Sequence, residues 1–230
     1  MKVKEIILKI YLLKDIHLDE VTKHINQLID EVLAIDPLWK DFHNENKFKN
    51  YCFDSLYPLE QDKIYKKGNI YTIRIRTIDT NLANLLNDKL CNIHNEKIKC
   101  LVTDMKIIAK KPIEKIYSIT PAILKDEKGY WKSNLSMNDF EKRLRSNLIK
   151  KYNNFNNTQI DKDFELYTSI EFKNKKPCKI KYKDITLLGD KISLEISSDS
   201  LAQEIAYMAL GTGILEFNSR GGGFVNFRWI

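Results

Sequence analysis

The stretch Ile107-Ile-Ala-Lys-Lys-Pro-Ile-Glu-Lys-Ile-Tyr117 joins two halves of the chain in which the same order of elements is predicted. Residues 98–109 before the junction and residues 113–124 after it are rich in β-branched and apolar residues, which favour strands. The two halves meet near Lys110-Lys111-Pro112.

The N-terminal half is predicted to contain strand, helix, strand, strand, helix and strand. From Asp19 onward, apolar residues such as Val21, Ile25 and Leu28 follow helical spacing. Asp36-Pro37 predicts a short additional helix, with Asp36 as N-cap and proline at the first position. The predicted strands are residues 3–13, 49–57, 70–77 and 98–109, and the second helix is 79–93.

The C-terminal half repeats this order. Its second helix is predicted to open with a capping box, Ser200 with Gln203. The predicted strands are 113–124, 165–172, a strand-rich stretch 178–196 and 223–230, and the helices are 137–152 and 200–210. The order predicts an α+β fold of two tandem ferredoxin-like (βαββαβ, RRM-like) domains, 1–111 and 112–230.

Composition narrows the class of protein. The 230 residues suit one large or two small domains, and 43 % apolar residues exclude a disordered chain. No apolar run approaches 18 residues, and the N-terminus lacks the apolar core of a signal peptide. The cysteines Cys52, Cys91, Cys100 and Cys178 lie in apolar stretches without metal-binding spacing, which favours buried free thiols. We therefore expect a cytoplasmic protein without membrane contact.

A glycine-rich segment lies between the last helix and the last strand. Five of the eight glycines fall between positions 211 and 223, and the net charge of +7 only slightly favours an anionic partner. A glycine-rich loop can hold phosphates through its N–H groups, although a dinucleotide fingerprint and a P-loop both require other contexts. The alternative is that Gly211 caps the helix and the others form tight turns. The predicted binding residues of the segment are Gly211, Gly213, Ser219, Arg220, Gly221, Gly222 and Gly223.

His43 is the candidate acid–base residue. It is followed by Lys47, Lys49 and Tyr51 on a loop that enters a strand, whereas His17, His24 and His94 are expected to be ordinary surface or half-buried residues. Histidine with a neighbouring lysine provides enough chemistry for RNA scission by the ribose 2′-OH. The acids have no metal-binding spacing, so no metal or other cofactor is expected.

Basic residues gather on two elements. Arg74 and Arg76 alternate with isoleucines and share one strand face. The helix 137–152 carries Lys142, Arg143, Arg145, Lys150 and Lys151. A solvated face is the alternative reading, but beside a glycine-rich loop phosphate contacts explain these cations better.

The combination resembles the RAMP superfamily of CRISPR-associated RNA-binding proteins and, within it, the repeat-cleaving endoribonucleases of the Cas-six family. The resemblance covers essentially the whole chain. It rests on residues 38–58, with His43 and Phe53-Asp54-Ser55-Leu56, on Tyr71-Thr-Ile-Arg-Ile-Arg-Thr77, on Ser118-Ile-Thr-Pro-Ala122, and on the glycine-rich loop.

The resemblance implies roles for the residues around His43. His43 would be the general acid/base, and Lys47 or Lys49 would stabilise the transition state. Some members add a tyrosine from the first helix, where this chain has Asp30 and Glu31, so Tyr51 is the substitute.

The implied reaction is metal-independent cleavage of CRISPR repeat RNA in precursor transcripts, releasing guide RNAs. The 2′-OH attacks the adjacent phosphate and leaves a 2′,3′-cyclic phosphate and a 5′-hydroxyl, so the substrate must be RNA. Repeat RNA is the implied partner; interference-complex subunits, and a monomeric or homodimeric state, stay open. The alternatives are a non-catalytic RAMP subunit that only binds crRNA and a general RNA-binding protein.

Overall fold

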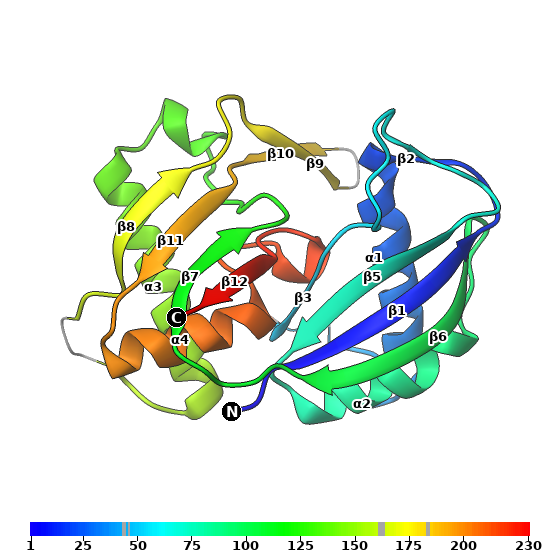
Figure 1. Ribbon diagram of the computed structural model, residues 1–230, viewed down its shortest axis with the longest axis horizontal. Helices are drawn as coiled ribbons and strands as arrows, with labels where there is room; N and C mark the ends of the chain where they lie inside the picture. The colour runs from blue at the N-terminus through cyan, green and yellow to red at the C-terminus, as the bar shows by residue number, and fades with distance from the viewer. Residues whose placement is uncertain (43–44, 46, 161–163, 183–184) are drawn as a thin grey trace.

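Two four-stranded antiparallel sheets, each covered by two helices, make up the computed structural model (Figure 1). It describes residues 1–42, 45, 47–160, 164–182 and 185–230. The strand orders are β3-β5-β1-β6 and β12-β7-β11-β8. Read from β6 and from β12, each sheet runs fourth, first, third, second strand of its half, which is the arrangement of a ferredoxin-like unit. The predicted fold class is confirmed.

The N-terminal half contains the four predicted strands and the two longer predicted helices. A small pair of strands, β2 (Ile16–His17) and β4 (Ile64–Tyr65), was not foreseen. The main elements are β1 (Lys4–Leu12), α1 (Leu18–Ile35), β3 (Tyr51–Phe53), β5 (Ile70–Thr77), α2 (Thr80–Lys89) with a 3₁₀ turn η1 (Leu90–Asn92), and β6 (Ile98–Ile107).

The C-terminal half repeats the order and inserts a hairpin before its third strand. That hairpin, β9 and β10, packs beside α1 of the other half. The elements are β7 (Ile113–Ser118), η2 (Trp131–Ser133), α3 (Met137–Asn156), β8 (Tyr167–Phe172), β9 (Cys178–Tyr182), β10 (Ile185–Gly189), β11 (Ile192–Ile196), α4 (Ser200–Thr212), η3 (Asn218–Arg220) and β12 (Val225–Trp229).

Three local predictions are corrected. Asp36 ends α1 and starts a hydrogen-bonded turn, accepting from the Leu38 amide, instead of capping a second helix. The N-cap of α4 is Asp199, whose carboxylate accepts from two backbone amides, and Gln203 instead pairs with the backbone of Ile113 in β7. The four cysteines are free, but only Cys52 and Cys100 are buried, while Cys91 and Cys178 are half-buried.

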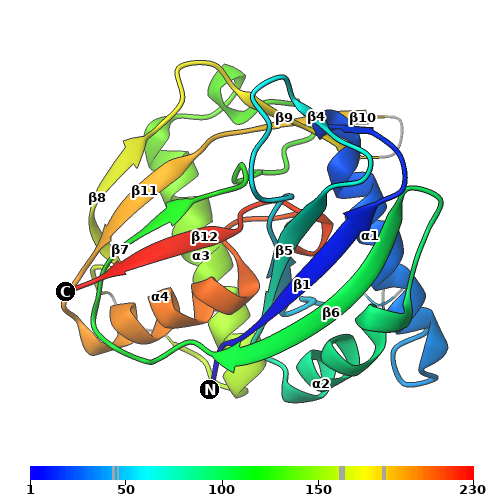
Figure 2. The same ribbon diagram turned by 45° about the vertical axis from the view of Figure 1, so that its right-hand side comes forward.

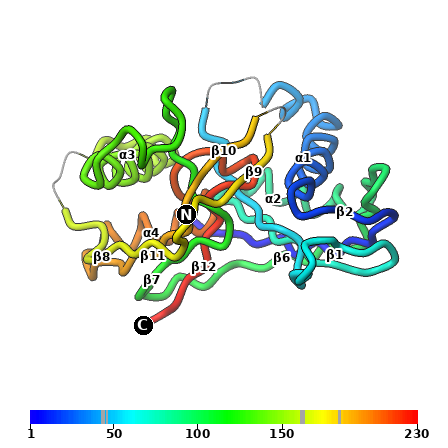
Figure 3. Tube along the Cα trace, turned by 90° about the horizontal axis from the view of Figure 1, so that it is seen from above, coloured from blue at the N-terminus to red at the C-terminus, as the bar shows by residue number. Residues whose placement is uncertain are grey.

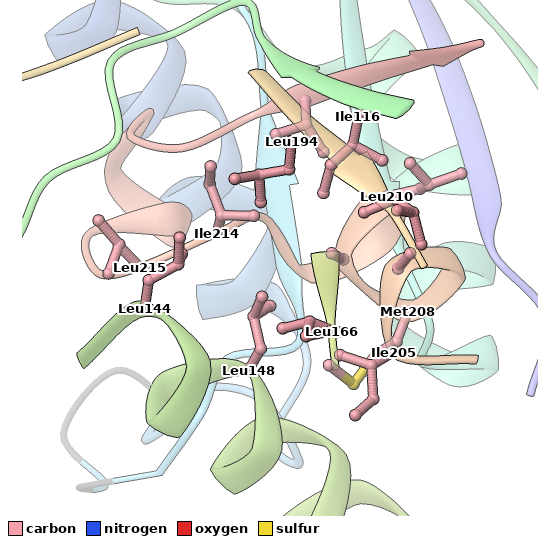
Figure 4. Packing of buried hydrophobic residues seen from close by; sticks show 14 of the residues in the cluster. Ile116, Leu144, Leu148, Leu166, Leu194, Ile205, Met208, Leu210, Ile214 and Leu215 are labelled. Carbon is pink, nitrogen blue, oxygen red and sulfur yellow. The ribbon is translucent and has the colours of Figure 1, made fainter. Parts of the chain in front are cut away.

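Each half has its own hydrophobic core between sheet and helices. In the C-terminal core, Leu144 and Leu148 of α3 face Ile214 and Leu215 from the glycine-rich segment (Figure 4). The segment is therefore anchored in the core at its start. Within the described residues, no helix is long and apolar enough to cross a membrane.

The two halves also contact each other directly. The Tyr207 hydroxyl of α4 accepts from the Val3 amide and donates to the Ile108 carbonyl, at 3.1 and 2.7 Å. The two sheets lie side by side with β12 and β5 at the centre (Figure 2). Seen from above, α1 and α3 lie on the same side of the sheets, and the segment between α4 and β12 lies between these two helices (Figure 3).

Candidate functional site

A groove of about 340 Å³ lies between the loop that enters β3, the glycine-rich loop and α3. It receives side chains from both halves of the chain. The predicted site residues Lys47, Lys49, Tyr51, Ser219 and Arg220 all line it. Lys125, Asn147, Lys151, Thr212 and Glu216 are among the other lining residues.

His43, the predicted acid–base residue, lies outside the described residues. The structure does describe Phe42 and Glu45 on either side of it, and Lys49 holds both of them. The Lys49 Nζ donates to the Phe42 carbonyl and, at 2.8 Å, to the Glu45 carbonyl, and it lies 4.6 Å from the centroid of the Phe42 ring. Lys49 thus fixes the segment that leads into β3.

Lys47 and Lys49 differ in their surroundings. The Lys47 side chain is 67 % exposed, and its Nζ lies 3.0 Å from the Glu45 carboxylate. Burial is the main cause that lowers the pKa of Lys49; Arg220 and Lys47 lower it further, and Glu45 opposes them. Because these cations repel one another at the groove, a bound anion would stabilise all three.

Tyr51 is a support for the glycine-rich loop. It is 1 % exposed, and its hydroxyl donates to the Ser219 carbonyl at 3.3 Å. Burial raises the pKa of the phenol well above its usual value. The hydroxyl therefore supports the loop, and the catalytic role of Tyr51 stays a prediction.

The glycines shape the loop, and their amides do not face a ligand. The amides of Gly213, Gly221, Gly222 and Gly223 donate to the carbonyls of Ala209, Asn218, Phe217 and Pro121. This contradicts the expectation that the N–H groups of these glycines grip phosphates. Ser219 and Arg220, which are partly exposed, are the residues of this loop that could bind a phosphate.

Backbone geometry explains why glycine occupies these positions. Gly213 is the C-cap of α4, with φ at +71°, whereas Gly211 lies inside the helix and not at its cap. A Cβ on Gly211 would approach Ile78 to 2.8 Å. A Cβ on Gly223, where φ is +64°, would lie 2.1 Å from the Ile214 carbonyl oxygen. The alternative interpretation, that these glycines cap the helix and form tight turns, is therefore correct for the backbone, but the capping residue is Gly213 and not Gly211.

Lys151 of α3 binds the inner side of the glycine-rich loop. Its Nζ donates to the carbonyls of Gly213 and Leu215, each at 2.9 Å, and to the Asn218 Oδ1 at 2.6 Å. The residue is 3 % exposed. Sequence analysis placed Lys151 on an exposed basic face, and this is corrected: it belongs to the core side of α3.

The other cations of α3 divide into two groups. Arg143 donates to the Lys125 carbonyl and pairs with Asp126 at 3.3 Å, and by helical spacing it and the exposed Lys150 share a face of α3 with Asn147, which lines the groove. Lys142 and Arg145 line a different hollow beside Phe164, whose carbonyl accepts from Arg145 at 2.8 Å. The predicted basic helix is thus not one surface.

Arg220 is fixed by an ion pair that the sequence did not reveal. Its Nη1 donates to both carboxylate oxygens of Asp30 in α1, at 3.0 and 2.8 Å, and to Asn26 at 3.3 Å. The pair joins the glycine-rich loop to the first helix of the other half.

Arg74 and Arg76 share one strand face, but they join the two sheets. Arg76 is 2 % exposed, pairs with Glu5 at 2.6 Å and donates to the Val225 carbonyl of β12 at 2.7 Å. The expectation that Arg76 binds phosphate is therefore wrong. Arg74 is partly exposed and pairs with the buried Asp54 at 2.6 Å.

Lys125 is a groove residue that sequence analysis missed. It is exposed, and it lies near the groove because its amide donates to Glu216 at 2.5 Å. No local pattern marks it, since it depends on contact between distant segments. In the part of the chain that the structure describes, no cluster of His, Cys, Asp or Glu could hold a metal ion.

The chain was compared with known proteins. The family model described as "CRISPR associated protein Cas6, C-terminal" matches residues 106–227, more than half of the chain. A curated protein of Methanocaldococcus jannaschii, "CRISPR-associated endoribonuclease Cas6 2", is 24 % identical over 155 residues, which cover 64 % of this chain and 63 % of that protein. The chain thus matches less than two thirds of that relative's length.

Solved structures share the fold. One is named "Characterization of a Cas6-related gene from Pyrococcus furiosus", with a TM-score of 0.72, 21 % identity and 98 % of each chain covered. Another is "An RAMP protein binding different RNA substrates", with a TM-score of 0.73, 19 % identity, and 98 % of this chain and 99 % of that one covered. At these identities the likeness concerns the fold alone.

Proposed function

Since this chain belongs to the Cas6 family of CRISPR-associated proteins, we propose that it is an endoribonuclease that cuts CRISPR repeat RNA in precursor transcripts. The observation that carries the proposal is the groove, where Lys47, Lys49, Lys125 and Arg220 meet from both halves of the chain. The groove adjoins Phe42 and Glu45, which flank His43 in the sequence. A cationic groove suits binding of a polyanion, and a histidine close to it in the sequence is a candidate for the acid–base step of cleavage.

The proposed reaction is attack of a ribose 2′-OH on the adjacent phosphate. The 2′-OH gives up its proton to solvent water as its oxygen forms the bond that closes a 2′,3′-cyclic phosphate, and the bond to the 5′-oxygen breaks. His43 gives a proton to that leaving oxygen, so the second product ends in a 5′-hydroxyl. This route requires no metal ion, because side chains provide both the proton and the positive charge.

We assign the two lysines different roles. Lys47 has an exposed ammonium that can move toward the phosphate and oppose the charge that develops on it. Lys49 already donates to two carbonyls and positions the loop. Ser219, Arg220, Lys125, Arg143 and Lys150 would hold the RNA around the cut site, with two domains, 1–111 and 112–230, contributing one wall each.

A binding-only RAMP subunit is the alternative function, and His43→Ala separates the two. We expect the variant to lose cleavage by about 10²- to 10⁴-fold, the usual contribution of a general acid. Its affinity for repeat RNA should stay within about twofold, since one neutral side chain adds little to a phosphate-dominated interface. The measurement is single-turnover cleavage of labelled repeat RNA beside a filter-binding titration.

Two outcomes would contradict the proposal. Cleavage by His43→Ala at the wild-type rate would place the acid elsewhere. Equal binding and cutting of repeat RNA and of a scrambled RNA with the same composition would indicate a general RNA-binding protein.

A further inference from the structure

Among the described residues, the buried Lys151 has no carboxylate as a hydrogen-bond partner. Within the described part of the chain, the acceptors of its three hydrogen bonds are two carbonyls and an amide oxygen, all neutral. An ammonium has three protons, so every one of them is used. Buried lysine charges are normally paired with an acid, because desolvation of an unpaired charge is costly. The site therefore lacks one negative charge.

The charged and titratable groups around Lys151 do not supply this negative charge. Burial lowers the pKa of Lys151 to about 7, and the Cys52 thiol of β3 and Glu216 of the glycine-rich loop oppose this only in part. Burial in turn raises the pKa of Cys52 to about 12, so the thiol is neutral. Across the groove lie Lys47, Lys49, Lys125 and Arg220, all positive.

We propose that RNA binding at this groove is coupled to proton uptake by Lys151, because a phosphate of the bound RNA provides the negative charge that the buried ammonium lacks. The inference rests on the proposed function. All three protons of Lys151 are used by the loop, so we treat it as a positioning residue: its ammonium holds Gly213, Leu215 and Asn218, while a neutral amine could donate only two of these hydrogen bonds.

The direction of the pH dependence follows from linkage. A nearby phosphate favours the charged form, so the pKa of Lys151 is higher in the complex than in the free protein. Between these two values, binding takes up a proton, and RNA affinity falls by at most about tenfold for each unit of pH above 7. Below pH 7 this group is protonated in both states and adds no pH dependence.

The experiment uses the full chain carrying His43→Ala, so that the RNA stays intact and this histidine does not titrate. Binding of repeat RNA is measured from pH 6.5 to 9, with calorimetry at pH 8 in buffers of different ionisation enthalpy. We expect weaker affinity above pH 7 and uptake of up to about one proton. Adding Lys151→Met should abolish both effects. Lys89→Met, which removes one exposed charge from the last turn of α2, should leave both unchanged.

A second variant guards against a folding defect in Lys151→Met. Lys151→Arg stays charged over the whole pH range, so it should bind tightly at pH 9 and take up no proton through this site. The inference is overturned if the His43→Ala protein binds repeat RNA without proton uptake at pH 8, or if a folded Lys151 variant keeps the uptake. Failure to prefer repeat RNA over scrambled RNA would instead overturn the proposed function.

Discussion

Among single residues, the cations predicted to bind phosphate differ in whether the structure buries or exposes them. Alternation in β5 correctly places Arg74 and Arg76 on one face. It does not reveal that β12 of the other half covers Arg76, because burial by a second sheet depends on contacts far apart in the chain. The burial of Lys151 was missed for the same reason. Lys47 is exposed on the loop that enters β3, and its catalytic role, like that of Tyr51, stays a prediction.

The buried ion pair of Arg76 leads to a stability prediction. Among the described residues, Arg76→Ala leaves the buried Glu5 with Lys106, at 3.1 Å, as its remaining ion-pair partner, and it should cost about 3–5 kcal/mol of unfolding free energy. Replacing both residues, as Arg76→Met with Glu5→Leu, should restore much of this loss. Urea denaturation followed by circular dichroism measures both. If Arg76→Ala leaves the urea midpoint unchanged but weakens RNA binding, Arg76 binds phosphate after all.

At the scale of elements, the glycine-rich loop was located correctly and its chemistry was misassigned. Five glycines in a short span do indicate unusual backbone, and φ is positive at Gly213, Gly221 and Gly223. The sequence could not show whether this backbone turns its amides outward or inward. The amides turn inward, and Lys151 and Asn218 complete the loop from within.

Gly223→Ala tests the tight packing of this loop. The added Cβ would meet the Ile214 carbonyl, so we expect a loss of at least about 1–3 kcal/mol from strain. Gly129→Ala is the matched control: φ there is +100°, but no described atom lies within 4 Å of the added Cβ. Gly223→Ala should lower the urea midpoint more than Gly129→Ala. Equal losses would mean that positive φ alone, without close packing, selects glycine at position 223.

For the whole molecule, the repeated order of strands and helices was enough to predict both sheets. Hydrophobic periodicity sets each element, and the ferredoxin-like order then fixes the strand neighbours. What joins the halves could not be predicted. The Asp30–Arg220 pair, the Tyr207 hydrogen bonds and the position of Lys125 all link distant segments by single side chains. The Asp30–Arg220 pair and the Tyr207 hydrogen bonds join the two halves, and the contact of Lys125 with Glu216 lies within the C-terminal half.

Attack by the 2′-OH of the RNA substrate can be tested with an RNA that lacks this hydroxyl at the cut site. Repeat RNA with a single 2′-deoxy nucleotide on the 5′ side of the cut is incubated with the wild-type chain and EDTA, beside the all-ribose RNA. We predict that the all-ribose RNA is cut to a 2′,3′-cyclic phosphate and a 5′-hydroxyl, and that the substituted RNA binds but is not cut, because it lacks the nucleophile. Cleavage of the substituted RNA, or loss of all cleavage in EDTA, would contradict the account.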